Sequence, residues 1–128
     1  MNTQIGILVI GNEILDGIVL DTNSQWLINQ LKALNFQVSE KMTIRDDTKV
    51  ISKAVRRMLS AGANLIFTTG GLGPTHDDKT LAGVAMAFEL PVEVNDKALK
   101  IVTRQYIDMH QRGMIETGEI TEPRRKMA

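Results

Sequence analysis

The strongest constraint on this chain is the alternation of short apolar runs with segments of helical periodicity. Ile5–Ile10 is an unbroken apolar run rich in β-branched residues, ended by Gly11, and predicts a strand buried on both faces. Phe36–Ile44 and Leu65–Phe67 predict two further strands, and Val92–Val94 a brief fourth one. Strands separated by helices imply βαβ units. The expected fold class is therefore α/β, a three-layer α/β/α sandwich with a mostly parallel sheet.

Capping residues and apolar spacing predict the helices between the strands. They run from Asp21 or Thr22 to Asn35, from Asp46–Thr48 to Ala61 with Gly62 closing the helix, through Leu81–Phe88 up to Pro91, and from Asp96 to about Gln111. Apolar residues at helical spacing should face inward. The first helix carries Trp26, Leu27, Leu31 and Leu34 at near-helical spacing, and the third carries Leu81, Val84, Ala85 and Phe88. The second has an apolar face of Val50, Ile51, Ala54, Val55, Met58 and Leu59, and the fourth is expected to face inward with Ala98, Ile101, Val102 and Met109.

Composition excludes several classes of protein. The chain of 128 residues carries 15 Lys+Arg and 15 Asp+Glu, so no net charge favours binding to nucleic acid or to an anionic membrane. There is no cysteine, which excludes disulfides, thiolate metal sites and a cysteine nucleophile. No apolar run approaches the roughly 20 residues needed to cross a bilayer. We expect a single domain over residues 1–128, located in the cytoplasm.

Carboxylates follow each of the first three predicted strands. The segments concerned carry Asn12, Glu13 and Asp16; Asp46 and Asp47; and His76, Asp77 and Asp78. Ligands of open α/β sheets bind at the carboxyl ends of the strands, so these residues should converge at one edge. Like charges about 4 Å apart repel by roughly 4 kcal/mol at an effective dielectric of about 20, so a converging acidic set favours a cation. Mg²⁺, held by carboxylates, water and substrate phosphates, is the expected metal.

A glycine-rich segment follows the third strand and predicts a phosphate loop. Gly70, Gly71 and Gly73, with Pro74 and Thr75, allow sharp turns and close approach of a ligand to the backbone. The helix that follows presents free N–H groups to an anion. The segment matches neither the dinucleotide fingerprint nor the P-loop, so it would be a different kind of phosphate loop.

Each of these features also has a purely structural interpretation. Asp77 and Asp78 could cap the following helix, and Asp46–Thr48 could do the same one helix earlier. The glycines could form only a tight turn between strand and helix, and His76 could simply face solvent. A turn needs one or two glycines, however, not three together with a proline and two acids. The joint pattern therefore favours a binding site.

Three stretches together resemble a known family. The runs GNEILDGIVLDTNSQWL, IRDD and TTGGLGPTHDDKT are similar to the MoaB/Mog domain of molybdenum-cofactor biosynthesis, and within it to the CinA-like group, the N-terminal domain of competence/damage-inducible protein A. The likeness covers roughly residues 4–128. Members of this superfamily bind molybdopterin or adenine nucleotides at the carboxyl edge of the sheet. The CinA-like branch looks like a metal-dependent ADP-ribose pyrophosphatase.

The resemblance also implies roles for single residues. It makes Gly70, Gly71 and Gly73 the phosphate cradle, and it makes Asp46 and Asp78 the catalytic acids. Asp46, Asp77 and Asp78 are the expected metal ligands, for Mg²⁺ first and otherwise for Mn²⁺ or Co²⁺. Glu13 and Asn23 are placed near the pocket. Pro74 and Thr75 of the loop are also expected to bind the ligand. Asn12 departs from the pattern, because many relatives carry Asp or Thr there.

Two other functions remain open at this point. One is Mg-ATP-dependent adenylyl transfer to molybdopterin, and the other is a non-catalytic module for ligand binding or assembly. The family domain normally runs some tens of residues further, so the chain is expected to be truncated at its C-terminal end. In longer proteins of the CinA-like branch a nicotinamide-nucleotide amidase domain often follows, and this second domain is expected to be absent here. The expected partners are a nucleotide or pterin and further copies of the chain in a dimer or trimer, with neither nucleic acid nor membrane.

Overall fold

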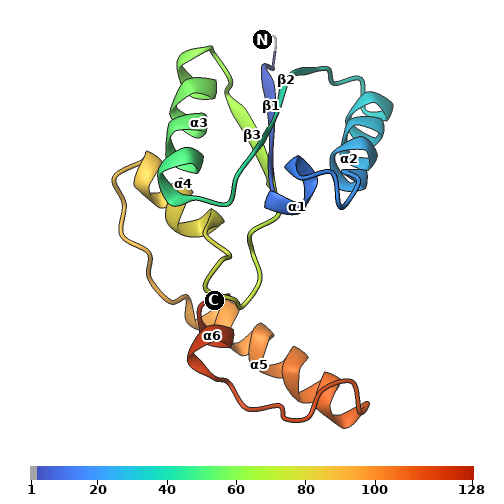
Figure 1. Ribbon diagram of the computed structural model, residues 1–128, viewed down its shortest axis with the longest axis vertical. Helices are drawn as coiled ribbons and strands as arrows, with labels where there is room; N and C mark the ends of the chain where they lie inside the picture. The colour runs from blue at the N-terminus through green and yellow to red at the C-terminus, as the bar shows by residue number, and fades with distance from the viewer. Residues whose placement is uncertain (1–2) are drawn as a thin grey trace. The chain divides into compact units, whose positions relative to one another are not determined.

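A computed structural model describes residues 3–128 and contains a sheet of three parallel strands (Figure 1). The strands are β1 (Ile5–Ile10), β2 (Val38–Ile44) and β3 (Leu65–Thr69), in the order β2-β1-β3. All six residues of β1 are buried, as expected of a central strand with both faces covered. All three strands run in the same direction, so their carboxyl ends lie at one edge. The prediction of an α/β fold with a parallel sheet is confirmed.

Helices follow the strands along the chain. They are α1 (Asn12–Leu15), α2 (Thr22–Ala33), α3 (Thr48–Ser60), α4 (Thr80–Ala87), α5 (Asp96–Gln111) and α6 (Glu122–Arg125). In Figure 1, α3 and α4 lie on one side of the sheet and α2 lies on the other. This arrangement is the predicted sandwich of two helical layers around a sheet.

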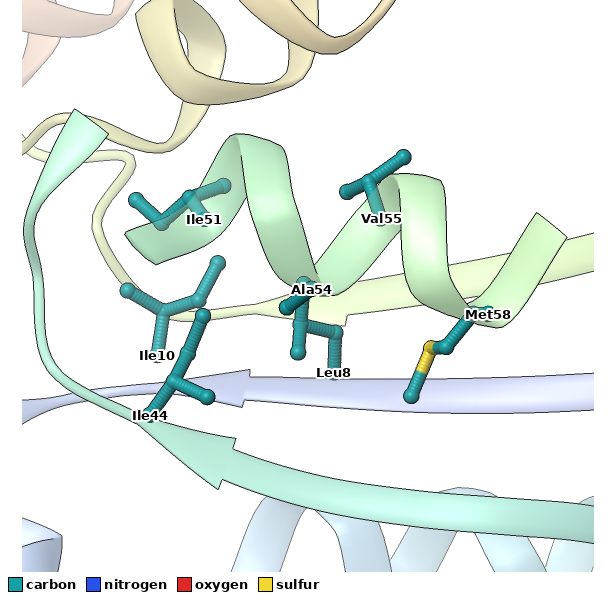
Figure 2. Packing of buried hydrophobic residues seen from close by; sticks show 7 residues of the cluster. All are labelled: Leu8, Ile10, Ile44, Ile51, Ala54, Val55 and Met58. Carbon is teal, nitrogen blue, oxygen red and sulfur yellow. The ribbon is translucent and has the colours of Figure 1, made fainter. Parts of the chain in front are cut away.

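Alternate side chains of β1 supply both halves of the core. Leu8 and Ile10 pack against the apolar face of α3 together with Ile44, as Figure 2 shows. The α3 side of this cluster consists of Ile51, Ala54, Val55 and Met58. Ile5, Ile7 and Val9 face the opposite way and pack against Leu31 of α2. The strand therefore fixes both helical layers, and with them the segments at the carboxyl edge.

Helix ends follow the predicted capping residues. The carboxylate of Asp21 accepts a hydrogen bond from the Ser24 backbone N–H at the start of α2, and Asp47 accepts from Lys49 and Val50 at the start of α3. Asn35 and Gly62 have positive φ angles of 62° and 97°, directly after the capping residues that end α2 and α3. In both cases the next backbone N–H bonds back to the last helical turn, which closes the helix in a Schellman motif.

Several predictions about the elements are wrong. Val92–Val94 forms no strand, and β2 begins at Val38 because the Phe36 N–H instead closes α2. Helix α4 ends at Ala87 and not at Pro91. Glu89, two residues after the end of the helix, adopts a left-handed φ angle of 57°. Ile101, predicted to face inward, is exposed, and so are Val50 and Leu59 of the predicted apolar face. Trp26, Leu34, Leu81 and Phe88, which also lie at helical spacing, are exposed as well. The apolar period identifies a helix face, but not whether another layer covers the whole of it.

Contacts divide the chain into two compact units. The first comprises residues up to Leu72 together with Asp77–Pro91, and it contains the sheet and α1 to α4. The second comprises Gly73–His76 and Val92–Ala128. In the second unit the Arg124 guanidinium lies 4.2 Å from the centre of the Tyr106 ring, and Lys126 Nζ donates to the Thr75 carbonyl. The expectation of a single domain over 1–128 stays a prediction.

Across residues 3–128, no helix combines the length and the apolar character that a membrane span requires.

Candidate functional site

The segments that follow the three strands are joined by hydrogen bonds through Asp46. The backbone N–H of Asp46 donates to Asn12 Oδ1 at 3.0 Å, which ties the end of β2 to the end of β1. Asp46 Oδ1 accepts from the backbone N–H of Lys79 at 3.0 Å, just before α4. The half-buried carboxylate of Asp46 therefore lies where the three strand ends meet. Convergence of these three segments at one edge follows from these bonds.

Gly70 and Gly71 form a tight turn against this network. Their φ angles are 88° and 63°, in the left-handed region that favours glycine. A Cβ at Gly70 would overlap the carbonyl oxygen of Ile10, and a Cβ at Gly71 would lie 3.0 Å from Asp46 Oδ2. Thr80, which is 1% exposed, holds the turn because its Oγ1 donates to the Gly70 carbonyl at 2.7 Å and its N–H to the Gly71 carbonyl at 3.2 Å.

The predicted phosphate loop is shared between the two units. Gly70 and Gly71 belong to the first unit, whereas Gly73, Pro74 and Thr75 belong to the second, together with His76. The Thr75 carbonyl is engaged by Lys126 there. Within the first unit, the predicted cradle thus consists of the Gly70–Gly71 turn. The part played by Gly73, Pro74 and Thr75 stays a prediction.

The remaining predicted residues lie on the first unit. Asp77 is exposed and Asp78 half-buried just before α4, whose N-cap residue is Lys79. Glu13 lies in α1 with its carboxylate folded over Gly11, where a Cβ would be 2.8 Å from Glu13 Oε1. Asn23 is exposed in the first turn of α2. The hydrogen bonds given above join Asp46 to Asn12 and Lys79; the roles of Asp78, Glu13 and Asn23 stay predictions.

Two of the acids have a structural role that sequence alone left open. Asp47 caps α3, and the hydrogen bond from the Val50 N–H is the main reason that the pKa of Asp47 is lowered. Lys79 and Lys49 add a smaller electrostatic contribution. Asp46 also holds the start of α4 from a different strand end. For Asp47 the capping interpretation is therefore correct, while Asp46 combines a structural bond with a position beside the glycine turn.

A metal centre made of protein ligands alone is not present in the described chain. Over residues 3–128, no group of three or more His, Cys, Asp or Glu side chains is placed to hold a metal ion. Mg²⁺, however, is commonly bound through one or two carboxylates, with water and substrate phosphates completing its shell. Asp46 places one such carboxylate beside the glycine turn. Its chemistry fits a metal that arrives with a phosphate ligand, and the role of Asp78 as a metal ligand stays a prediction.

Sequence reasoning missed the roles of two side chains at this edge: Thr80 holds the glycine turn, and Arg45 pairs with Asp16. Asn12 is among the residues expected at this edge, but its hydrogen bond to the Asp46 backbone is not predictable from the sequence. The signal for Thr80 is its place at the end of the run TTGGLGPTHDDKT, at the start of the following helix. Bonds from side chains to the backbone of a distant segment have no sequence period. They could therefore not be found by the search for helical or strand spacing.

A second polar cluster anchors α2 to β2, away from the glycine turn. Asp21 accepts hydrogen bonds from the backbone and side chain of Ser24, and Lys41 Nζ lies 3.2 Å from Asp21 Oδ2 and 3.3 Å from Ser24 Oγ. Burial is the largest single influence and raises the pKa of Asp21, but the hydrogen bonds from Ser24 and Lys41 outweigh it, so that the pKa is lowered overall. The side chain of Asp21 is 11% exposed, whereas that of Lys41 is 41% exposed, so only the carboxylate is shielded from water.

We expect Asp21→Asn to lower the free energy of unfolding by about 1 kcal/mol at pH 7, because asparagine still caps a helix but loses the charge that Lys41 faces. A carboxyl whose pKa is lowered on folding stabilises above its unfolded pKa and loses this effect as the pH falls through the folded pKa. The difference between wild type and variant should therefore shrink below about pH 4. Urea unfolding at pH 7 and pH 3 measures this, and a difference that grows on acidification would refute the assignment.

Three cavities of the first unit lie elsewhere. One of about 500 Å³ lies between α2 and β2, one of about 350 Å³ lies at the amino end of the sheet, and one of about 230 Å³ lies beside β3. None of the predicted site residues lines any of these three cavities. These three cavities thus lie apart from the acidic residues of the carboxyl edge. The chemistry favours the carboxyl edge, because that is where ligands of parallel sheets bind.

Comparisons with known proteins agree with this architecture. The family model described as "Probable molybdopterin binding domain" matches residues 6–121. Protein PH0439 of Pyrococcus horikoshii is 36% identical over 122 residues, which cover 95% of this chain and 48% of that protein. A protein of Aeropyrum pernix is 42% identical over 122 residues, covering 95% of this chain and 42% of its own length. The chain thus spans about half the length of the curated relatives it matches.

Solved structures show the same fold. The crystal structure of CinA from Thermoplasma acidophilum, a protein described as having unknown function, matches with a TM-score of 0.84 at 30% identity, covering 100% of this chain and 70% of that one. MoaB from Thermus thermophilus matches with a TM-score of 0.63 at 23% identity, covering 80% and 63%. The second likeness shows the fold alone. From the matched residues and the shared fold, the chain belongs to the family of probable molybdopterin binding domains, as a CinA-like member of the MoaB/Mog superfamily.

Proposed function

We propose that this domain binds a nucleotide with two linked phosphates, such as ADP-ribose, and hydrolyses the bond between them with the help of a divalent metal. The observation that carries the proposal is the position of Asp46. Its carboxylate reaches the start of α4 and also lies against Gly71. A carboxylate is thereby placed beside the glycine turn, at the edge where ligands of parallel sheets bind.

The charge balance of the edge supports a ligand that brings a cation. Near the carboxyl edge, α1 and the segments 16–20, 45–47 and 70–79 carry the cations Arg45 and Lys79 and the acids Glu13, Asp16, Asp46, Asp47, Asp77 and Asp78. Phosphate alone would be repelled by this excess of negative charge. A divalent metal bound with the phosphates reverses the sign of that interaction, which is the chemistry that Mg²⁺ supplies in phosphate sites.

In this proposal the chain itself provides position and charge. One phosphate would bind beside the Gly70–Gly71 turn, which Thr80 keeps in place. Asp46 and Asp78 would hold the metal. A water molecule would attack one phosphorus atom, forming a new P–O bond while the bond to the bridging oxygen breaks. The products of ADP-ribose hydrolysis would be AMP and ribose 5-phosphate.

Product analysis tests this function directly. The protein is incubated with ADP-ribose and Mg²⁺, Mn²⁺ or Co²⁺, and the products are identified by mass. AMP and ribose 5-phosphate in equal amounts, formed only with metal, would support the proposal. An adenylylated pterin, formed from ATP and molybdopterin while ADP-ribose stays intact, would replace it with adenylyl transfer. Nucleotide binding without turnover in any metal would indicate a non-catalytic module.

A further inference from the structure

Arg45 lies at the carboxyl edge directly before Asp46. Its Nη2 is 2.6 Å from Asp16 Oδ1, and its Nη1 donates to the Asn12 carbonyl at 3.4 Å. Both partners lie on the segment that follows β1, whereas Arg45 itself follows β2. The guanidinium is thus held across two strand ends.

The ion pair itself adds little to the stability of the fold. The side chains of Arg45 and Asp16 are 51% and 44% exposed, and exposed pairs contribute about 0–1 kcal/mol. A guanidinium has five N–H donors in a planar fork, of which the two contacts above use two. This fork matches the oxygens of a phosphate. At an edge with many acids, the positive charge of Arg45 can attract the phosphate of a ligand.

Asn12 connects Arg45 to the candidate site. Its carbonyl accepts from Arg45, while its side chain holds the backbone of Asp46, whose carboxylate lies against Gly71. We propose that Arg45 binds the phosphate of ADP-ribose that the Gly70–Gly71 turn does not hold, with Asp16 and Asn12 orienting its guanidinium. This inference rests on the function proposed above and adds to it a residue that recognises a second phosphate.

The chain contains a matched control at the opposite end of the sheet. Arg57, near the end of α3, has its Nη1 2.6 Å from Glu40 Oε1, the same separation as in the Arg45 pair. The side chain of Arg57 is 57% exposed, close to the value for Arg45. Arg57→Met therefore removes an equivalent surface ion pair without touching the carboxyl edge.

Two measurements test Arg45→Met against this control. Binding of ADP-ribose is measured by calorimetry with Mg²⁺ at low temperature, where turnover is slow, and KM and kcat are measured with Mg²⁺ under turnover conditions. We expect Arg45→Met to weaken binding or raise KM at least about tenfold, the usual effect of losing a hydrogen bond to a charged group, with kcat changed less than KM. Arg57→Met should stay within about twofold of wild type in both.

Asp16→Asn separates recognition of phosphate from anchoring of the loop. It leaves the guanidinium in place but removes its partner, so we expect a smaller loss than with Arg45→Met. An equal loss in both variants would show that Arg45 only anchors the segment after β1, and would overturn the inference. If the wild type hydrolyses ADP-ribose and Arg45→Met does so with the same KM and kcat, the inference about Arg45 would also be overturned. The proposed function would then still stand. Absence of both binding and turnover in wild type would refute the two proposals together.

Discussion

Asp78→Asn is expected to lower ADP-ribose hydrolysis by about 10²–10³-fold at saturating metal, while the protein keeps its fold. Asp78 is half-buried and directly precedes Lys79, whose N–H is bound by Asp46. Replacing the carboxylate by an amide keeps the size of the side chain but removes the charge proposed to hold the metal. Initial rates over a range of Mg²⁺ concentrations measure the loss, and circular dichroism checks the fold.

Asp108→Asn is the control for this prediction. Asp108 lies in α5, is 51% exposed and pairs with Arg112 one helical turn later, so it also loses a surface charge when changed. The rate of ADP-ribose hydrolysis by the Asp108→Asn variant should equal that of wild type. If Asp78→Asn were as active as Asp108→Asn with metal saturating, the proposed role of Asp78 would be excluded.

Gly70→Ala is expected to destabilise the fold by about 3 kcal/mol or more. The φ angle of 88° is unfavourable for any residue with a Cβ, which costs about 1–2 kcal/mol. The added Cβ would also overlap the Ile10 carbonyl oxygen, so the backbone at the ends of β1 and β3 would have to separate. Forced overpacking of this kind typically adds about 1–3 kcal/mol. Urea unfolding monitored by circular dichroism gives the change in free energy.

Gly17→Ala separates the two causes. Gly17 has a similar φ of 73°, but a Cβ there would meet nothing within 4 Å. It should therefore show the conformational cost alone, about 1–2 kcal/mol. Equal destabilisation by the two variants would mean that the close approach to Ile10 has no energetic consequence, contrary to the geometry of the turn.

Local signals in the sequence were sufficient for most of the fold. The apolar run of β1 needs both faces covered, and Asp21, Asp47, Asn35 and Gly62 all act at helix ends as predicted. Each of these features depends on a few neighbouring residues. Val92–Val94 shows where such reasoning fails, because strand formation requires a partner strand that local pattern does not specify.

The candidate site was predictable in its location but not in its connections. The rule that ligands bind at the carboxyl ends of parallel strands placed Asp46 and the glycines at one edge. The bonds that Asn12 and Thr80 make to the backbone depend on how three distant segments pack together. Nor could the sequence show that Gly73 belongs to a different compact unit from Gly70. These properties belong to the tertiary structure, and only coordinates reveal them.

The central claim is that a divalent metal and a phosphate ligand bind at the carboxyl edge beside the Gly70–Gly71 turn. Paramagnetic Mn²⁺ broadens the amide NMR signals of nearby residues, so a titration with Mn²⁺ and ADP-ribose locates the site. The account predicts that the signals of Asp46, Gly70, Gly71 and Asp78 broaden first, while those of Gly62 and Asn64, at the opposite end of the sheet, stay sharp. Broadening centred on Gly62 and Asn64, or none at the carboxyl edge, would contradict it.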